Sequence, residues 1–113
     1  MLLNILPAMK RLSKADFLQQ VKAQVLAIDP QAEVYLFGSR ARNNQRRNSD
    51  WDFLVLTEKE LTLQLKYDIW DMFTELELAT GEIINPVVHS KQEWTKQQFS
   101  PFYWNVLEEG RPV

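Results

Sequence analysis

Three runs of apolar residues predict the strands of a small sheet. The first is Val34-Tyr35-Leu36-Phe37, which is short and β-prone and therefore typical of a buried strand. The second is Phe53-Leu54-Val55-Leu56, which directly follows Asp50-Trp51-Asp52, so we expect one strand over 50–56. A third strand is expected over 82–88. Polar residues, glycines and prolines between the runs mark the turns.

Apolar residues spaced three and four apart predict two longer helices. The first helix begins after Ser13, a typical N-cap, and ends at Asp29-Pro30. Its apolar stripe consists of Phe17, Val21, Val25 and Ile28. The second helix is expected over 58–79, and Gly81 is well placed to end it. Its apolar stripe consists of Leu61, Leu65, Ile69, Met72, Leu76 and Ala79.

Two shorter helices are predicted near the C-terminus from their capping residues. Ser90 with Glu93 forms a capping box. Ser100, Pro101 and Gly110 have the N-cap, first-turn and C-terminal positions of a last helix. The resulting order is α-β-β-α-β-α-α. It predicts an α/β (α+β) fold in which a small mixed β-sheet carries helices mainly on one face, as a single domain over residues 1–113.

Composition narrows the class of protein. The chain has 113 residues, with 45% apolar and 25% charged residues, as is ordinary for a globular domain. It contains no cysteine, which excludes disulfides and thiolate metal sites. The net charge of −2 makes nucleic acid a possible but not a favoured partner. No apolar run has the length of a membrane span, and residues 1–7 lack the features of a signal peptide, so we expect a cytoplasmic protein.

The candidate chemistry lies between the first two strands. Gly38 follows the first strand and allows a sharp turn, and Ser39 with the amides after it can bind a phosphate at a helix start. Ten residues later, Asp50 and Asp52 share one face of the second strand because side chains alternate, and Trp51 takes the other face. Two neighbouring carboxylates at the start of a buried strand favour a bound cation, such as magnesium that also contacts the phosphates of a nucleotide.

These residues resemble a known family. The pattern Gly-Ser-x10-Asp-x-Asp, present here as GSRARNNQRRNSDWD, is similar to the signature of the DNA polymerase β-like nucleotidyltransferases. The chain looks like the minimal nucleotidyltransferases of prokaryotes, and SPFYWNVLEEG resembles the end of their short bacterial members. The resemblance extends over about residues 32–110 and implies a polymerase β-like palm, with Mg²⁺ and ATP or another nucleoside triphosphate as cofactors.

The resemblance also implies roles for individual residues. Asp50 and Asp52 would be the catalytic metal ligands, and Gly38 and Ser39 would hold the triphosphate. Arg40 and Arg42 lie beside this phosphate site and could offer guanidinium groups to it, with Arg40 as the stronger candidate. A solvated loop is the alternative interpretation for both arginines.

Two positions depart from the family pattern, Asn85 and Asn43. The third strand of the family usually carries another acidic residue, and alignment places Asn85 there. An asparagine can contribute a carbonyl oxygen to a metal, but it carries no charge and cannot take a proton. Glu82 lies three residues earlier and faces the opposite side of a regular strand. Asn43, where relatives often have glycine, tolerates a left-handed backbone.

Several other residues have structural interpretations. His89 could act as a base, but a lone histidine that ends a strand is more often structural. Trp51 and Trp70 are interpreted as core residues. Phe102, Tyr103 and Trp104 cannot all point inward from one helix, so at least one should reach the surface, as an adenine platform or a partner contact. Arg46 and Arg47 are interpreted as a solvated loop rather than a polynucleotide contact.

The favoured hypothesis is a minimal nucleotidyltransferase that transfers a nucleoside monophosphate, AMP by preference, to an acceptor on a partner chain. The resemblance suggests a HEPN-type helical partner, as in toxin–antitoxin pairs in which the transferase adenylylates the toxin. A second hypothesis is a degenerate nucleotidyltransferase fold that binds a partner or a nucleotide without transfer. A metal-dependent nuclease would also use paired aspartates, but it would leave Gly38 and Ser39 unexplained. The acceptor, the base preference and the oligomeric state do not follow from the sequence.

Overall fold

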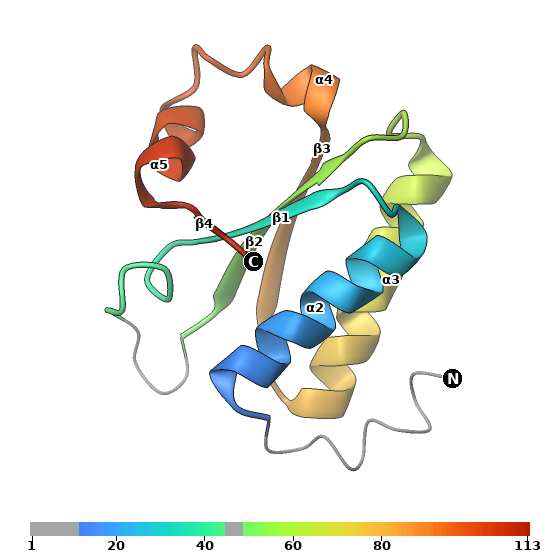
Figure 1. Cartoon of the computed structure of the whole chain (residues 1–113), viewed down its shortest axis with the longest axis vertical. Helices are drawn as coiled ribbons and strands as arrows, with labels where there is room; N and C mark the ends of the chain where they lie inside the picture. The colour runs from blue at the N-terminus through green and yellow to red at the C-terminus, as the bar shows by residue number, and fades with distance from the viewer. Residues whose placement is uncertain (1–11, 45–48) are drawn as a thin grey trace.

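The computed structural model describes residues 12–44 and 49–113, and a four-stranded mixed sheet forms its centre (Figure 1). The strands are β1 (Glu33–Phe37), β2 (Trp51–Thr57), β3 (Ile84–Ser90) and β4 (Arg111–Pro112), and they lie in the order β3-β2-β1-β4. β2 is parallel to β3, and β1 is antiparallel to both β2 and β4. The predicted mixed sheet is confirmed. β4 was not predicted, because two residues after a helix carry no alternating pattern.

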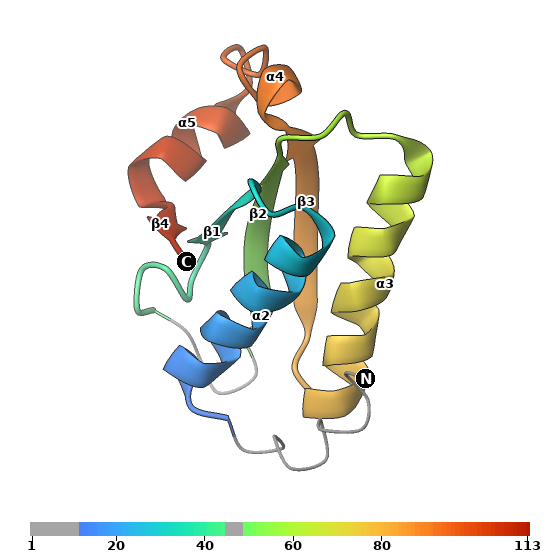
Figure 2. The same ribbon diagram turned by 45° about the vertical axis from the view of Figure 1, so that its right-hand side comes forward.

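Helices cover both faces of the sheet. α2 (Lys14–Ile28) and α3 (Leu63–Thr80) lie on one face, whereas α4 (Lys91–Trp94) and α5 (Pro101–Glu109) lie on the other (Figure 2). The prediction that helices pack mainly on one face therefore describes only the two long helices. In residues 12–44 and 49–113, no helix combines the length and the apolar character that a membrane crossing requires.

The two hydrophobic clusters follow the alternation of side chains along β2. Phe53 and Val55 are fully buried against α2 and α3. Leu54 and Leu56 instead point to the opposite face, where they pack with Trp94 and Val106 of α4 and α5. Burial of one such large apolar side chain contributes about 1.5–3 kcal/mol. Since both faces of β2 are covered, this strand is the centre of the fold.

The predicted helix caps are confirmed. The backbone N–H groups of Asp16 and Glu93 donate to the hydroxyls of Ser13 and Ser90 over 3.1 and 3.0 Å. The hydroxyl of Ser100 accepts from the N–H of Phe102 over 3.2 Å. Gly81 ends α3 in the left-handed region with φ +75°, a conformation that glycine adopts without strain.

The start of α3 differs from the prediction. The helix begins at Leu63 after the N-cap Thr62, and not at Glu58. The hydroxyl of Thr62 accepts the N–H of Leu65 over 3.1 Å and caps the helix at this point. The buried carboxylate of Asp29, at the end of α2, accepts the N–H groups of Glu58 and Lys59 over 2.8 and 3.2 Å and so holds the segment before the cap. β3 also begins two residues later than predicted, at Ile84.

Candidate active site

Asp50, Asp52 and Asn85 lie together at one end of β2 and β3. Asp50 directly precedes β2, and Asp52 pairs in register with Asn85 of the parallel strand β3. The side-chain amide Nδ2 of Asn85 donates to Oδ2 of Asp50 over 2.9 Å and to Oδ1 of Asp52 over 3.3 Å. Asn85 therefore faces both aspartates, as the alignment of the third strand predicts.

The amide of Asn85 relieves only part of the repulsion between the carboxylates. Burial is the largest cause that raises the pKa of Asp52, and the nearby charge of Asp50 raises it further. The hydrogen bond from Asn85 and the positive charge of Arg42 act in the opposite direction. Because an amide is neutral, the site keeps two carboxylates without a formal counter-charge between them. Such a pair favours binding of a cation.

The donor set fits magnesium. Mg²⁺ is commonly held by one or two carboxylates together with the phosphates of its substrate, and the carbonyl of an asparagine is a further oxygen donor. Asp50 and Asp52 supply the carboxylates, whereas Asn85 turns its Nδ2 toward them and would have to rotate its amide to offer the carbonyl oxygen. No cluster of three His, Cys, Asp or Glu residues suited to a metal occurs in the described part of the chain. A site here would thus rely on two aspartates and a nucleotide.

Glu82 lies on the opposite side of the strands from the aspartates, as predicted. Its carboxylate accepts the indole N–H of Trp51 over 2.9 Å. Trp51 is buried, points toward α2, and contacts the ring of Phe17 at a centroid distance of 4.6 Å. Glu82 therefore cannot serve as a third acid beside Asp50 and Asp52 without a rearrangement of the segment before β3.

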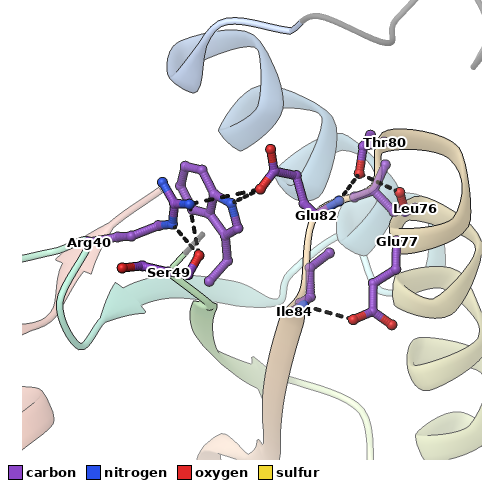
Figure 3. Close-up of polar contacts among 8 residues, drawn as sticks. Arg40, Ser49, Leu76, Glu77, Thr80, Glu82 and Ile84 are labelled. Atoms are coloured by element: carbon purple, nitrogen blue, oxygen red, sulfur yellow. Dashed lines mark hydrogen bonds and ion pairs between the residues drawn. The ribbon is translucent and has the colours of Figure 1, made fainter. Parts of the chain in front are cut away.

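Arg40 belongs to this same opposite side. Its Nε and Nη2 donate to the carbonyl oxygen of Ser49 over 3.0 and 2.7 Å, and its guanidinium lies 3.9 Å from the centroid of the Trp51 ring (Figure 3). Only 10% of the side chain is exposed, and Glu82 lies within 3.8 Å of Nη2. The arginine that we expected to be the stronger phosphate ligand is occupied by structural contacts in this arrangement.

The side chain of Arg42 is more exposed than that of Arg40. It is half-exposed and pairs with Glu109, at the end of α5, over 2.9 Å. Its positive charge also acts on Asp52. The geometry thus favours Arg42 over Arg40 as a group that could meet a phosphate, which reverses our ranking. No sequence signal links Arg42 to Glu109, because 67 residues separate them.

A hydrogen-bonded turn follows β1 where we expected the start of a helix. The N–H groups of Ala41 and Arg42 both donate to the carbonyl of Gly38, and no helix is assigned between residues 38 and 44. Asn43 has φ 55°, so the left-handed backbone that we expected asparagine to tolerate is present. A phosphate at Ser39 would therefore not meet the N-terminus of a helix, and the N–H groups of Ala41 and Arg42 are already engaged within the turn.

Gly38 has two reasons to be glycine. Its φ is +75°, and a Cβ built on it would collide with Oδ2 of Asp52 and lie 3.1 Å from Cγ. The close neighbour arises because Phe37 pairs in register with Asp52. The space beside Gly38 is therefore filled by the Asp52 carboxylate. From the sequence alone, we expected this space to be needed only by a phosphate.

The remaining candidates lie elsewhere. His89 pairs with Leu56, four residues along β3 from Asn85 and thus about 13 Å away, and its ring packs on Trp94. Trp104 is 57% exposed, which confirms that one aromatic of α5 reaches the surface. The interpretation of Trp70 as a core residue is wrong, since it is 41% exposed. Arg46 and Arg47 lie outside the described residues.

A comparison of two glycines isolates the role of Gly38. Both Gly38 and Gly81 have φ +75°, but nothing lies within 4 Å of a Cβ at Gly81. Gly81→Ala should therefore cost only the left-handed conformation, about 1–2 kcal/mol. Gly38→Ala should cost about 1–3 kcal/mol more, because it also displaces the Asp52 carboxylate. Urea unfolding of both variants measures the difference, and equal losses would show that the contact with Asp52 does not matter.

The raised pKa of Asp52 predicts a pH dependence of stability. Between the ordinary and the raised pKa, the folded state binds more protons than the unfolded state, so wild type loses stability as pH rises through this window. Asp52→Asn has no such proton to lose. Its stability relative to wild type should therefore increase with pH when measured by denaturant unfolding with EDTA present. Asp71→Asn, on the exposed surface of α3, is the control and should show no comparable trend.

Comparisons with known proteins identify the family of this chain. A sequence profile described as "Polymerase beta, Nucleotidyltransferase" matches residues 15–111. The chain is 35% identical over 79 residues to the Methanocaldococcus jannaschii protein named "Putative protein adenylyltransferase MJ0604", covering 70% of this chain and 74% of the relative. Chains from two solved toxin–antitoxin structures share the fold. One was solved with AMP-PNP and has 23% identity, a TM-score of 0.54 and coverage of 83% of this chain and 70% of that chain. The other is a variant of MntA-HpeT with 21% identity, a TM-score of 0.59 and coverage of 83% and 69%. The chain therefore belongs to the polymerase beta nucleotidyltransferase family.

Proposed function

We propose that this single-domain chain is a minimal nucleotidyltransferase that moves AMP from ATP to an acceptor on a partner protein. The observation that carries the proposal is the pair Asp50 and Asp52, which lies beside the Gly38-Ser39 turn and is bridged by Asn85. The relative from Methanocaldococcus jannaschii carries the name of a protein adenylyltransferase, which supports AMP as the group transferred and a protein as the acceptor.

Different residues of the site would bind the metal and the phosphates of the nucleotide. Asp50 and Asp52 would hold Mg²⁺, which neutralises charge on the phosphates when it is bound, and Asn85 would join them through its carbonyl only after its amide rotates. Gly38 and Ser39 would bind the triphosphate, although the N–H groups of Ala41 and Arg42 are engaged by the Gly38 carbonyl, and Arg42 would add a positive charge that also acts on Asp52. We assign Arg40 no phosphate contact, since its guanidinium is held on the opposite side by Ser49 and Trp51.

The transfer itself is a displacement at the α-phosphate. A hydroxyl oxygen of the acceptor forms a bond to the α-phosphorus, the bond from phosphorus to the bridging oxygen breaks, and pyrophosphate leaves. The hydroxyl proton must go to a basic group, and Asn85 cannot take it because an amide is not basic at neutral pH. Asp52, water or the acceptor itself must therefore accept the proton.

We further propose a helical HEPN-type protein as the partner, in a toxin–antitoxin pair. The structural neighbours support a partner of the toxin–antitoxin kind, since both were solved as toxin-antitoxin structures and one with AMP-PNP. One of them is a variant in which two aspartates at Asp-x-Asp spacing are replaced by glutamates, which is consistent with a functional aspartate pair in that protein.

A second function is favoured by one specific observation. Asn85 occupies the place of a third carboxylate and leaves the site with two acids. A chain with such a site could retain the fold to bind its partner or a nucleotide without transfer. The family, the turn at Gly38 and both aspartates favour the active enzyme.

Ligand binding is tested by the effect of Mg²⁺ and ATP on stability. A ligand that binds only the folded state raises its stability by about 2.7 kcal/mol at a hundred times the dissociation constant. Mg²⁺ with ATP should therefore raise the melting temperature of wild type, and the double variant Asp50→Asn with Asp52→Asn should lose this shift. Asp68→Asn with Asp71→Asn on α3 is the matched control for lost charge. A shift that survives in the site variant would place the ligand elsewhere.

Catalysis is tested at Asn85. Wild type and Asn85→Asp are incubated with ATP labelled on the α-phosphate and with a candidate partner protein of the HEPN type. We expect wild type to label that protein, Asp52→Asn to lose this activity, and Asn85→Asp to label it about 10²–10⁴-fold faster if the new carboxylate acts as the base. Labelling by Asn85→Asp alone would instead support the binding module. If neither wild type nor any variant transfers the label or binds a nucleotide, the proposed function is overturned.

A further inference from the structure

We propose that Arg40, Trp51 and Glu82 act as positioning residues for the candidate active site. These three residues, called the Arg40 cluster below, lie behind the strands, on the side away from the aspartates. The inference rests on the proposed function, because it assigns the cluster the task of holding Asp50, Asp52 and Asn85 in the geometry that binds a metal and a nucleotide.

The Arg40 cluster is joined by several mutual contacts. Arg40 donates twice to the Ser49 carbonyl, over 3.0 and 2.7 Å, and lies 3.9 Å from the centre of the Trp51 ring. Glu82 accepts the indole N–H of Trp51 over 2.9 Å and lies 3.8 Å from the Arg40 guanidinium through the same Oε2 atom. One carboxylate oxygen thus connects the ring and the cation that packs on it.

The cluster touches each chain segment that carries a site residue. Arg40 lies two residues after Gly38, and its acceptor Ser49 directly precedes Asp50. Trp51 lies between the two aspartates. Glu82 lies three residues before Asn85 and brings the start of β3 to the same place. A shift of Arg40 would therefore move the segments that carry both aspartates and Asn85, although the hydrogen bonds and the ion pair of the Arg40 side chain go to other residues.

Glu82 is itself anchored to α3 (Figure 3). Its backbone N–H donates to Oγ1 of Thr80 over 3.2 Å, and the Thr80 hydroxyl donates to the carbonyl of Leu76 over 2.7 Å. The N–H of Ile84 donates to the carboxylate of Glu77 over 2.7 Å. The cluster is therefore fixed to a rigid helix on one side and to the loop before Asp50 on the other.

The residue type at position 40 fits positioning better than ligand binding. A planar guanidinium can donate two parallel hydrogen bonds to one carbonyl while its face packs on a ring, and a lysine ammonium cannot do both. Its burial also requires that its charge be compensated locally, which the Ser49 carbonyl, the Trp51 ring and Glu82 provide. Groups that orient metal ligands in this way typically change metal affinity or activity 10–100-fold, roughly, when replaced.

The test uses two conservative variants, Arg40→Lys and Glu82→Gln, and two readouts. The first is the NMR signal of the Asn85 side-chain amide, whose protons lie between Asp50 and Asp52. The second is the affinity for Mn²⁺ with a non-hydrolysable ATP analogue, followed by electron paramagnetic resonance. We expect both variants to shift the Asn85 signal toward that of a free amide, and to weaken Mn²⁺ binding about 10–100-fold.

Two controls separate positioning from a general loss of stability. Lys91→Gln removes ion pairs with Glu33 and Glu58 at the other end of β3, and Val25→Ala lowers the stability of the core. Both should leave the Asn85 signal and Mn²⁺ affinity unchanged while the protein is folded. An unchanged Asn85 signal and affinity in folded Arg40→Lys would overturn the positioning proposal. If wild type binds no Mn²⁺ and no nucleotide, the proposed function fails, and the Asn85 signal alone then decides whether the cluster positions the site.

Discussion

The alternation of side chains along β2 is the constraint on which the rest of the structure depends. Its odd-numbered residues Trp51, Phe53 and Val55 pack against α2 and α3, while Leu54 and Leu56 face α4 and α5. The same alternation places Asp52 on the second face. A slip of one residue in the pairing with β1 or β3 would move every side chain to the other face and bury Asp52 among aromatic rings. The hydrophobic core therefore fixes the orientation of the site.

The two faces of the sheet differ in how the charges of their side chains are compensated. On the α2 side, the charge of Arg40 is surrounded by a carbonyl, an aromatic ring and a carboxylate, so its compensation is complete within the protein. On the α5 side, Asp50 and Asp52 share only the neutral amide of Asn85 and a more distant arginine. Groups with a shifted pKa gather at functional sites, and the raised pKa of Asp52 places such a group on the α5 side.

Local signals in the sequence were sufficient for most of the fold and for part of the site. The serine caps depend on contacts within three residues, and the shared face of Asp50 and Asp52 depends only on strand geometry, so both could be predicted. The late start of α3 was missed although its N-cap Thr62 is a local signal, because the apolar stripe was counted from Leu61. The direction of Arg40 was missed for a different reason: its partners become neighbours only after β1, β2 and the start of β3 assemble. A short strand such as β4 has no pattern to detect.

The edges of the sheet have a consequence for association between molecules. β4 covers the free side of β1, so that strand offers no long row of unpaired backbone groups. β3 forms the other edge, and Pro86 in its middle brings no backbone N–H to that edge. An added strand from a second molecule would lack a hydrogen bond there or meet the covered side of β1. Pro86 and the short strand β4 therefore disfavour growth of the sheet into strand-paired aggregates at its two edges.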